Sequence, residues 1–278
     1  MKPTKQKKRL DLLLNERRPD LSRNRIRAEI MAGRVYVNGR VIDKPGTILD
    51  SSVDIKLHEA ENPYVSRGGM KLEGALQTFS INVEGLVVLD VGASTGGFTD
   101  CLLKKGAKLV YALDVGYGQL DFNLRNDSRV MVMERFNVRN LTNENLEIKP
   151  DLAVVDVSFI SLAKVIPVLN RIGIAAIVAL VKPQFEAGRA DADRGKGVIR
   201  NPELHIRVLE EAAAYACKAG YCCKGLTYSR WPGPKGNLEY FIYLEHRNNK
   251  DCICLANIGE VAADVVDQAH RELKTKED

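Results

Sequence analysis

Runs of apolar residues recur through the later part of the chain, separated by polar turns and by longer stretches with helical spacing. Runs this rich in Val, Ile and Leu are typical of strands that are buried on both faces of a sheet. The predicted strands are 86–91, 108–114, 130–134, 151–157, 173–182, 221–228 and 238–245, and the predicted helices are 68–79, 202–219 and 255–273. This alternation predicts an α/β fold with a mostly parallel, seven-stranded sheet and helices on both of its faces.

Residues 7–58 have a shorter and more mixed pattern. The predicted elements there are two short helices followed by short strands, at 8–15, 23–32, 35–41 and 53–57. Asn38-Gly39 interrupts an alternation of apolar and polar residues, which is typical of a hairpin turn. We therefore predict a small α+β domain at 1–59, a linker at 60–67 and a larger domain at 68–278.

Charge is distributed unevenly between these two parts. The chain of 278 residues has a formal net charge of +5, yet residues 1–72 contain 16 Lys and Arg against 9 Asp and Glu, whereas residues 73–278 contain 25 and 27. A basic module on a near-neutral body is typical of proteins that bind an anionic partner, although a solvated basic tail has the same composition. No apolar stretch is long enough to span a bilayer, and no secretory signal is evident, so we expect a cytoplasmic protein without stable membrane association.

Several motifs of the basic domain resemble the S-four-type RNA-binding domain, which is named after a ribosomal small-subunit protein. These motifs are Arg9-Leu-Asp-x-x-Leu, Leu21-Ser-Arg, Ile30-x-x-Gly33-x-Val-x-Val-Asn-Gly39 and Lys44-Pro45. The resemblance implies that the anionic partner is a structured RNA. Its phosphates would be bound by arginines, which we predict to be Arg9, Arg23, Arg27, Arg34 and Arg40.

A glycine-rich turn follows the first predicted strand of the larger domain. In Asp90-Val-Gly-Ala-Ser-Thr-Gly-Gly-Phe98 the glycines allow a ligand to lie close to backbone N–H groups, and their spacing differs from that of dinucleotide binders. The loop resembles the first motif of S-adenosylmethionine-dependent methyltransferases. Asp114 ends the next strand, where nucleotide-binding α/β folds bind ribose hydroxyls. The predicted contacts of S-adenosylmethionine are Asp90, Gly92, Ala93, Ser94, Gly96, Gly97, Phe98, Asp114, Asn137 and Asp156.

Four charged residues, Lys71, Asp156, Lys182 and Glu239, are the candidates for catalysis. Each of them alone is more typical of a salt bridge or of the surface, but Asp156 and Lys182 end neighbouring predicted strands. Together the four resemble the Lys-Asp-Lys-Glu tetrad of RNA ribose 2′-O-methyltransferases. The resemblance implies that Lys182 activates the ribose 2′-hydroxyl and that Asp156 positions Lys182. Lys71 and Glu239 would then fix the lysine network and the target ribose.

The combination of the two domains resembles the haemolysin A (TlyA) family. This resemblance implies a Rossmann-like methyltransferase fold, S-adenosylmethionine as cofactor, and 2′-O-methylation of cytidine in 16S or 23S ribosomal RNA, with ribosomal subunits as partners. Arg67, Arg194 and Lys196 are further predicted RNA contacts, although the loop that carries the last two is equally typical of a solvated segment. No metal is expected, because the Cys and His residues lack the spacing of metal ligands.

Two other classes of function remain as alternatives. A non-catalytic RNA-binding factor in ribosome assembly would keep the fold but would not bind S-adenosylmethionine. A haemolysin-like membrane-active protein, which the family name suggests, would act on lipid vesicles without a methyl donor. The glycine-rich loop and the tetrad favour the methyltransferase.

Overall fold

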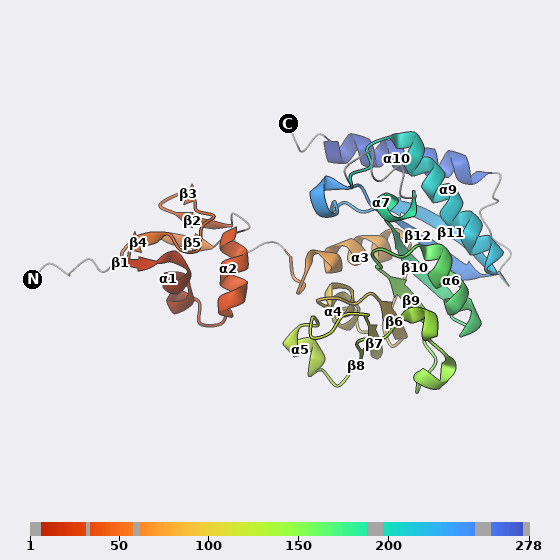
Figure 1. Ribbon diagram of the computed structural model, residues 1–278, viewed down its shortest axis with the longest axis horizontal. Coiled ribbons are helices and arrows are strands. Elements are labelled where there is room, and N and C mark those ends of the chain that lie inside the picture. The colour runs from red at the N-terminus through yellow and green to blue at the C-terminus, as the bar shows by residue number, and fades with distance from the viewer. Residues whose placement is uncertain (1–6, 32–33, 58–61, 188–196, 248–256, 275–278) are drawn as a thin grey trace, which may run out of the picture. The chain divides into compact units, whose positions relative to one another are not determined.

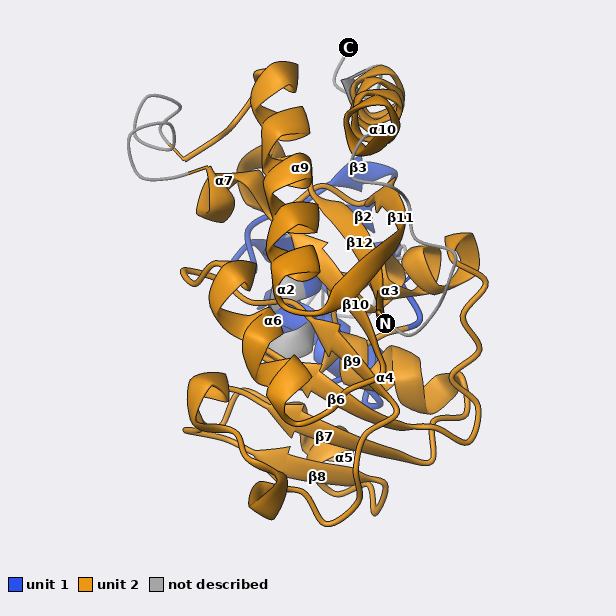
Figure 2. Ribbon diagram, turned by 90° about the vertical axis from the view of Figure 1, so that its right-hand side faces the viewer, with its two compact units in different colours: residues 1–63 blue, residues 64–278 orange. Residues whose placement is uncertain are grey.

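The computed structural model describes residues 7–31, 34–57, 62–187, 197–247 and 257–274 (Figure 1). The chain divides into two compact units, Met1–Pro63 and Tyr64–Asp278 (Figure 2). The first two residues of the predicted 60–67 linker lie outside the described ranges.

The first unit is a small α+β domain. Its elements are β1 (Lys7–Arg9), α1 (Leu10–Arg17), α2 (Arg23–Met31), β2 (Val35–Val37), β3 (Arg40–Val41), β4 (Ile48–Asp50) and β5 (Ile55–Leu57). The predicted hairpin is confirmed: β2 pairs with β3 in antiparallel fashion, and Asn38 and Gly39 between them have φ values of 49° and 79°. The predicted helix at 8–15 begins later, at Leu10, because Lys7–Arg9 pairs with β4.

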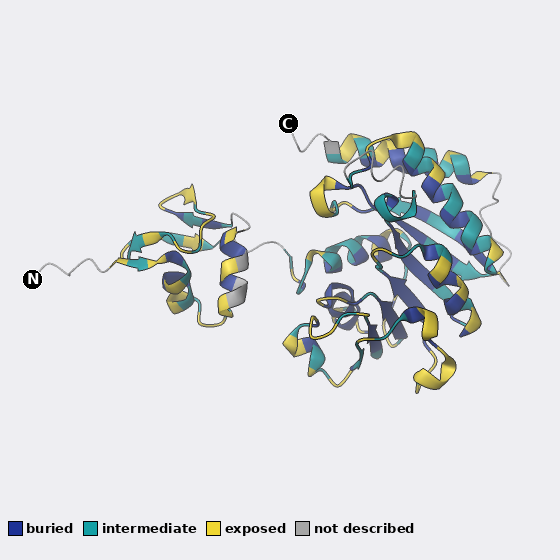
Figure 3. Cartoon of the chain, in the orientation of Figure 1, coloured by how far each residue is buried: buried dark blue, intermediate teal, exposed yellow. Residues whose placement is uncertain are grey.

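Six buried apolar side chains hold this unit together. They come from both helices and from β2, and they are Leu10, Leu14, Ile26, Ile30, Val35 and Val37. A core of this size leaves most of the unit's polar side chains at the surface (Figure 3). The predicted end of the second helix, at residues 32–33, lies outside the described residues.

The second unit is built on a seven-stranded sheet in the order β11-β12-β10-β9-β6-β7-β8. Its strands are β6 (Val87–Val91), β7 (Leu109–Leu113), β8 (Val130–Met133), β9 (Leu152–Val155), β10 (Ala176–Val181), β11 (Tyr221–Tyr228) and β12 (Tyr240–His246). Neighbours from β10 to β8 are parallel, whereas β12 is antiparallel to both β10 and β11. The predicted mostly parallel seven-stranded sheet is therefore confirmed.

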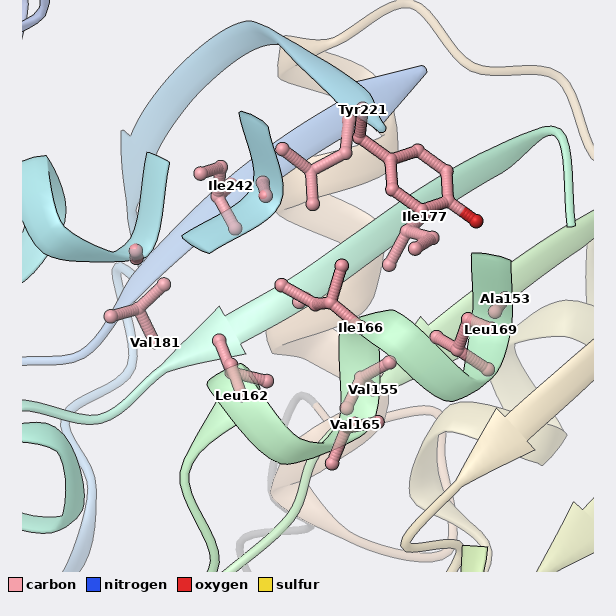
Figure 4. Close-up of a cluster of buried hydrophobic side chains, with 14 of the residues drawn as sticks. Ala153, Val155, Leu162, Val165, Ile166, Leu169, Ile177, Val181, Tyr221 and Ile242 are labelled. Atoms are coloured by element: carbon pink, nitrogen blue, oxygen red, sulfur yellow. The ribbon is translucent and has the colours of Figure 1, made fainter. Parts of the chain in front are cut away.

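Helices cover both faces of this sheet, as predicted. One face packs against α3 (Arg67–Thr78), α4 (Gly97–Lys104) and α5 (Phe122–Arg125), and the other against α6 (Leu162–Arg171), α9 (Pro202–Lys218) and α10 (Ile258–Lys274). Short helical turns are α7 (Pro183–Glu186), η1 (Val138–Asn140), η2 (Asn143–Asn145) and η3 (Pro234–Gly236). Side chains of β10 alternate between the two cores: Ile177 and Ala179 face α6, and Val178 and Leu180 face the other layer. Figure 4 shows α6 packed on β9 and β10 through this first core.

The strand directions bring the candidate site residues to one edge of the sheet. Four of these residues directly follow a parallel strand and therefore share the carboxyl edge of the sheet. They are Gly92, Asp114, Asp156 and Lys182. Glu239 precedes β12, and because β12 is antiparallel its amino end lies at this same edge. In the described part of the chain, no helix is long and apolar enough to cross a membrane.

Candidate active site

The glycine-rich loop between β6 and α4 has an unusual backbone. Gly92, Ser94 and Gly96 all have positive φ, at 90°, 49° and 95°. A Cβ atom on Gly92 would collide with the backbone oxygen of Asp156, and one on Gly97 would collide with the Ser66 hydroxyl. These glycines are therefore required by the close approach of neighbouring segments. The N–H groups of Gly92 and Gly96 donate to backbone oxygens within the protein, so the loop is held in this conformation by its own hydrogen bonds.

Asp114 fixes this loop from the end of β7. Its Oδ2 accepts a hydrogen bond from the Ser94 N–H at 2.8 Å, and its Oδ1 accepts one from the Gly116 N–H at 2.7 Å. A carboxylate oxygen has lone pairs for more than one donor, so Asp114 can also accept from a ligand hydroxyl.

A cavity of about 520 Å³ lies beside Asp114 at the ends of β6, β7 and β9. The predicted residues that line it are Gly92, Ser94, Asp114, Asn137 and Asp156. Its apolar walls include Val115, Val138, Phe159 and Ile160. Apolar walls combined with a carboxylate and a backbone loop suit a nucleoside, whose base is flat and whose ribose carries hydroxyls.

A second cavity of about 410 Å³ lies between the glycine-rich loop, the start of α3 and the loop before η3. Its predicted lining residues include Arg67, Lys71, Ala93, Gly97 and Phe98. Gly92, Ser94 and Asp156 line both cavities, so these three residues form a shared wall.

Asp90 is placed differently from the other predicted cofactor contacts. It is fully buried and lines neither cavity, and its Oδ2 accepts a hydrogen bond from the Thr99 hydroxyl at 2.6 Å. Burial raises the pKa of Asp90 to about 7; the Thr99 hydrogen bond opposes this shift, and the nearby Asp156 charge adds to it. Gly96 also lines neither cavity, because it packs against Leu124 of α5.

Lys182 and Asp156 form an ion pair across the ends of β10 and β9. The Lys182 Nζ lies 2.5 Å from Asp156 Oδ1, and both side chains are largely shielded from solvent. The same ammonium donates a hydrogen bond to the Ser158 hydroxyl at 3.1 Å. Lys182 itself lines neither cavity, and its ammonium is connected to their shared wall through its contact with Asp156.

Lys71 and Glu239 form the second ion pair. The Lys71 Nζ donates to Glu239 Oε2 at 2.6 Å, with side-chain exposures of 11% and 0%. Gln184 donates to the other carboxylate oxygen at 3.4 Å. A Cβ on Gly233 would collide with that carboxylate, so the Pro232–Pro234 loop lies directly against it.

Sequence reasoning did not assign roles to several residues around the tetrad. Ser158, Gln184 and Gly233 each contact or closely approach one tetrad member. Ser158 and Gln184 lie two residues from Asp156 and Lys182, so proximity in sequence was the available signal. Gly233 gave no comparable signal, because only the folded loop brings it to Glu239.

The predicted RNA-binding arginines differ in their surroundings. Arg23, Arg27, Arg40 and Arg67 are exposed, and Arg67 lines the smaller cavity. Two others have acidic partners within the first unit: Arg9 pairs with Asp11 at 2.7 Å, and Arg34 pairs with the buried Glu29. Arg194 and Lys196 lie outside the described residues.

Comparisons with known proteins agree with this architecture. The model of the FtsJ-like methyltransferase family matches residues 64–246, and the S4 domain model matches residues 8–55. A protein of Mycobacterium tuberculosis named 16S/23S rRNA (cytidine-2′-O)-methyltransferase TlyA is 45% identical over 87% of this chain and 91% of its own. Hemolysin A of Brachyspira hyodysenteriae is 44% identical over 84% of this chain and 98% of its own.

A solved structure from Streptococcus thermophilus that carries the name hemolysin is 43% identical, covers 98% of both chains, and superposes with a TM-score of 0.76. The predicted membership of a methyltransferase family is confirmed by these similarities, which extend over both units. The chain belongs to the FtsJ-like methyltransferase family, in its haemolysin A (TlyA) group, and joins that domain to an S4 domain.

Proposed function

We propose that this protein transfers a methyl group from S-adenosylmethionine to the ribose 2′-hydroxyl of cytidine in ribosomal RNA. The observation that carries the proposal is the pair of shielded lysine–carboxylate ion pairs, Lys182–Asp156 and Lys71–Glu239, at the edge where the glycine-rich loop lies. The name of the Mycobacterium tuberculosis relative supports the choice of substrate.

S-adenosylmethionine fits the residues that are present. The larger cavity has the volume and the apolar walls for its adenosine, and Asp114 has lone pairs for the ribose hydroxyls. Gly92 and Ser94 line both cavities, so the loop would contact the part of the cofactor that extends toward the smaller one. When bound, the cofactor supplies a methyl carbon attached to a positively charged sulfur.

Lys182 and Asp156 would act on the target hydroxyl. A ribose 2′-hydroxyl is a weak nucleophile until its proton is removed or shared during attack. Lys182 would hydrogen-bond the 2′-oxygen and stabilise the negative charge that develops there as the hydroxyl proton passes to water, while Asp156 keeps the ammonium in place at 2.5 Å. Alignment of the oxygen with the methyl group supplies a further part of the acceleration.

Lys71, Glu239 and Arg67 would hold the RNA side of the reaction. Lys71 and Arg67 line the smaller cavity, and Glu239 fixes the Lys71 ammonium at its wall. We assign the target ribose to this cavity and an adjacent phosphate to Arg67, because a guanidinium binds phosphate oxygens in a bidentate manner.

The first unit would supply affinity for a structured RNA. Its exposed Arg23, Arg27 and Arg40 can neutralise phosphates without base specificity. The proposed partners are ribosomal subunits, and since ribosomes are cytoplasmic we assign the protein to the cytoplasm.

Methylation of purified ribosomal subunits tests the proposal directly. The protein and a methyl-labelled donor should place label on a cytidine ribose, as located by mass spectrometry of nuclease fragments. Label on a base would contradict the mechanism. RNA binding without donor binding would indicate a non-catalytic assembly factor, and leakage of lipid vesicles in the absence of donor would indicate a membrane-active protein.

A further inference from the structure

We propose that Glu186 is a positioning residue that holds the Asp156 loop and the Lys182 turn in the geometry that methyl transfer requires. The proposal rests on the function proposed above for Lys182 and Asp156. It concerns a residue four positions beyond Lys182 that lines neither cavity.

The Glu186 carboxylate binds the amino end of α6. Its Oε2 accepts a hydrogen bond from the Ser161 hydroxyl at 2.6 Å, and its Oε1 accepts one from the Leu162 N–H at 2.8 Å. The Ser161 oxygen in turn accepts from the Ala163 N–H at 3.1 Å. Of the N–H groups that a helix leaves unpaired at its start, one is thus satisfied by the carboxylate and a second by the hydroxyl that the carboxylate orients.

The helix to which Glu186 binds is anchored on the sheet. Leu162, Val165, Ile166 and Leu169 of α6 are at most 1% exposed and pack on β9 and β10 (Figure 4). The amino end of α6 therefore has a fixed position relative to the strand ends that carry Asp156 and Lys182.

Glu186 is also rigidly connected to Lys182. The Glu186 N–H donates to the Lys182 carbonyl at 3.1 Å, and the Phe185 N–H donates to the same oxygen at 2.9 Å, so residues 182–186 form one closed turn. Pro183 occupies the first position of this turn and restricts its backbone. Movement of the Glu186 backbone would consequently move Lys182.

Several contacts join the segment 156–162 to the turn 182–186, and one of them is between the rings of Phe159 and Phe185, whose centroids lie 4.8 Å apart. Lys182 pairs with Asp156 at one end, and Glu186 binds Ser161 and Leu162 at the other. The intervening loop contains Phe159, which has a positive φ of 64°. An aromatic residue disfavours this backbone conformation, so its local preference does not hold the loop in place. The Glu186 contact therefore adds a restraint at the α6 end of this loop, beyond those that Lys182 and Phe185 provide.

The link forms despite an electrostatic cost. Burial raises the pKa of Glu186, the hydrogen bonds from Ser161 and Leu162 oppose that shift, and the charge of Glu211 on α9 adds to it. The hydrogen bonds from Ser161 and Leu162 therefore offset part of the cost of shielding this carboxylate from water.

Three variants test the proposal in the full chain. Glu186→Ala removes both hydrogen bonds and should lower kcat about tenfold to hundredfold, because small misplacements of reacting groups have effects of that order. The KM for RNA should stay within about twofold, because Glu186 lines neither cavity. Glu186→Gln has nearly the same shape, so it should recover kcat to within about threefold of wild type. Ser161→Ala removes one of the two contacts and keeps the protein testable if Glu186→Ala does not fold.

Asp151 provides a matched control. Its Oδ2 accepts a hydrogen bond from the Val87 N–H at 2.9 Å, which links the amino ends of β9 and β6 at the opposite edge of the sheet. Asp151→Ala thus removes the same kind of link and should leave kcat unchanged. An equal loss of kcat in Asp151→Ala and Glu186→Ala, or a wild-type kcat in Glu186→Ala, would overturn the proposal.

Hydrogen exchange separates this proposal from the proposed function. The amides of residues 157–163 should exchange at least about tenfold faster in Glu186→Ala than in wild type or Asp151→Ala, whether or not RNA is methylated. If wild-type protein methylates no ribosomal RNA, the proposed function fails while the exchange result still decides whether Glu186 holds the loop. Unchanged exchange in Glu186→Ala would refute that role.

Discussion

The ion pairs of the two units contain the same kinds of residue in different surroundings. In the first unit, Arg18 and Asp20 pair at 2.7 Å with side-chain exposures of 31% and 57%. In the second, Lys71 and Glu239 pair at 2.6 Å with exposures of 11% and 0%. The distances are nearly equal, so burial is what distinguishes the two pairs.

This difference separates two uses of charge. An exposed pair contributes little to stability and leaves its cation accessible to an incoming phosphate. A buried pair is costly to desolvate, and removing one partner leaves an uncompensated charge. The Arg18–Asp20 pair is thus suited to diffuse attraction of RNA, and the Lys71–Glu239 pair to fixing charged groups at defined positions.

The largest effect is expected from Lys182→Ala. Loss of the ammonium that pairs with Asp156 should lower the rate of methyl transfer by about a thousandfold or more. Binding of RNA should be unchanged, because the exposed arginines of the first unit are intact. Single-turnover kinetics with labelled donor measure the rate, and a filter-binding assay measures RNA affinity. A parallel loss of RNA affinity would contradict the separate roles of the two units.

Lys71→Ala should produce the largest loss of stability. It leaves the fully buried Glu239 carboxylate without the ammonium that neutralises it, which should cost about 3 kcal/mol of the free energy of unfolding. Arg18→Ala in the first unit should cost less than about 1 kcal/mol, because that pair is exposed. Urea denaturation of both variants compares them, and equal costs would remove the contrast between buried and exposed pairs.

Asp90→Asn extends the comparison to a buried carboxyl group for which the described residues provide no ion pair. In the described part of the chain, Asp90 Oδ1 has no hydrogen-bond partner, and burial raises the pKa of Asp90 to about 7. The folded state therefore retains the proton to higher pH than the unfolded state, so this residue's contribution to stability is lost as pH rises from about 4 to about 7.

Asparagine at position 90 does not titrate. Between pH 5 and pH 8 the wild-type protein should lose about 2.5 kcal/mol of unfolding free energy relative to Asp90→Asn. Denaturation curves at several pH values measure this difference. A constant difference across the range would mean that the carboxyl group does not titrate as its burial implies.

The smallest effect is expected in the first unit. The double substitution Arg23→Ala and Arg27→Ala should weaken RNA binding about tenfold and should reduce the slope of log Kd against log salt by about 1 to 2. Donor binding should be unchanged, because both residues lie in the first unit. Salt titrations measure the change in RNA binding, and calorimetry with the donor measures donor affinity. A change in donor affinity would argue against separate roles for the two units.

The strands of the second unit were predictable because burial on both faces leaves continuous apolar runs. All seven predicted strands are present, with ends that differ by up to three residues. The glycine-rich loop was also recognisable, because Gly92 meets the Asp156 backbone and accepts no side chain. Positions of this kind restrict the residue type, so they can be recognised from the sequence alone.

The sequence predicted less well which charged residues contact one another. Asp90 was predicted to contact the cofactor, but the alternation of β6 turns its side chain inward to Thr99. Arg34 was grouped with phosphate-binding arginines, whereas it pairs with Glu29. Glu186 stood in the motif beside Lys182, and only the fold brings it to the amino end of α6. Each of these outcomes depends on side-chain direction, which residue spacing alone does not determine.

The antiparallel placement of β12 has a consequence for biosynthesis. Lys71 and Glu239 are separated by 168 positions in sequence, and β12 lies between β10 and the earlier-made β11. The sheet therefore cannot be completed until β12 has left the ribosome. A nascent chain that ends before β12 lacks one of the two lysine–carboxylate pairs. Catalytic competence should thus arise late in translation, in a single step that requires almost the whole chain.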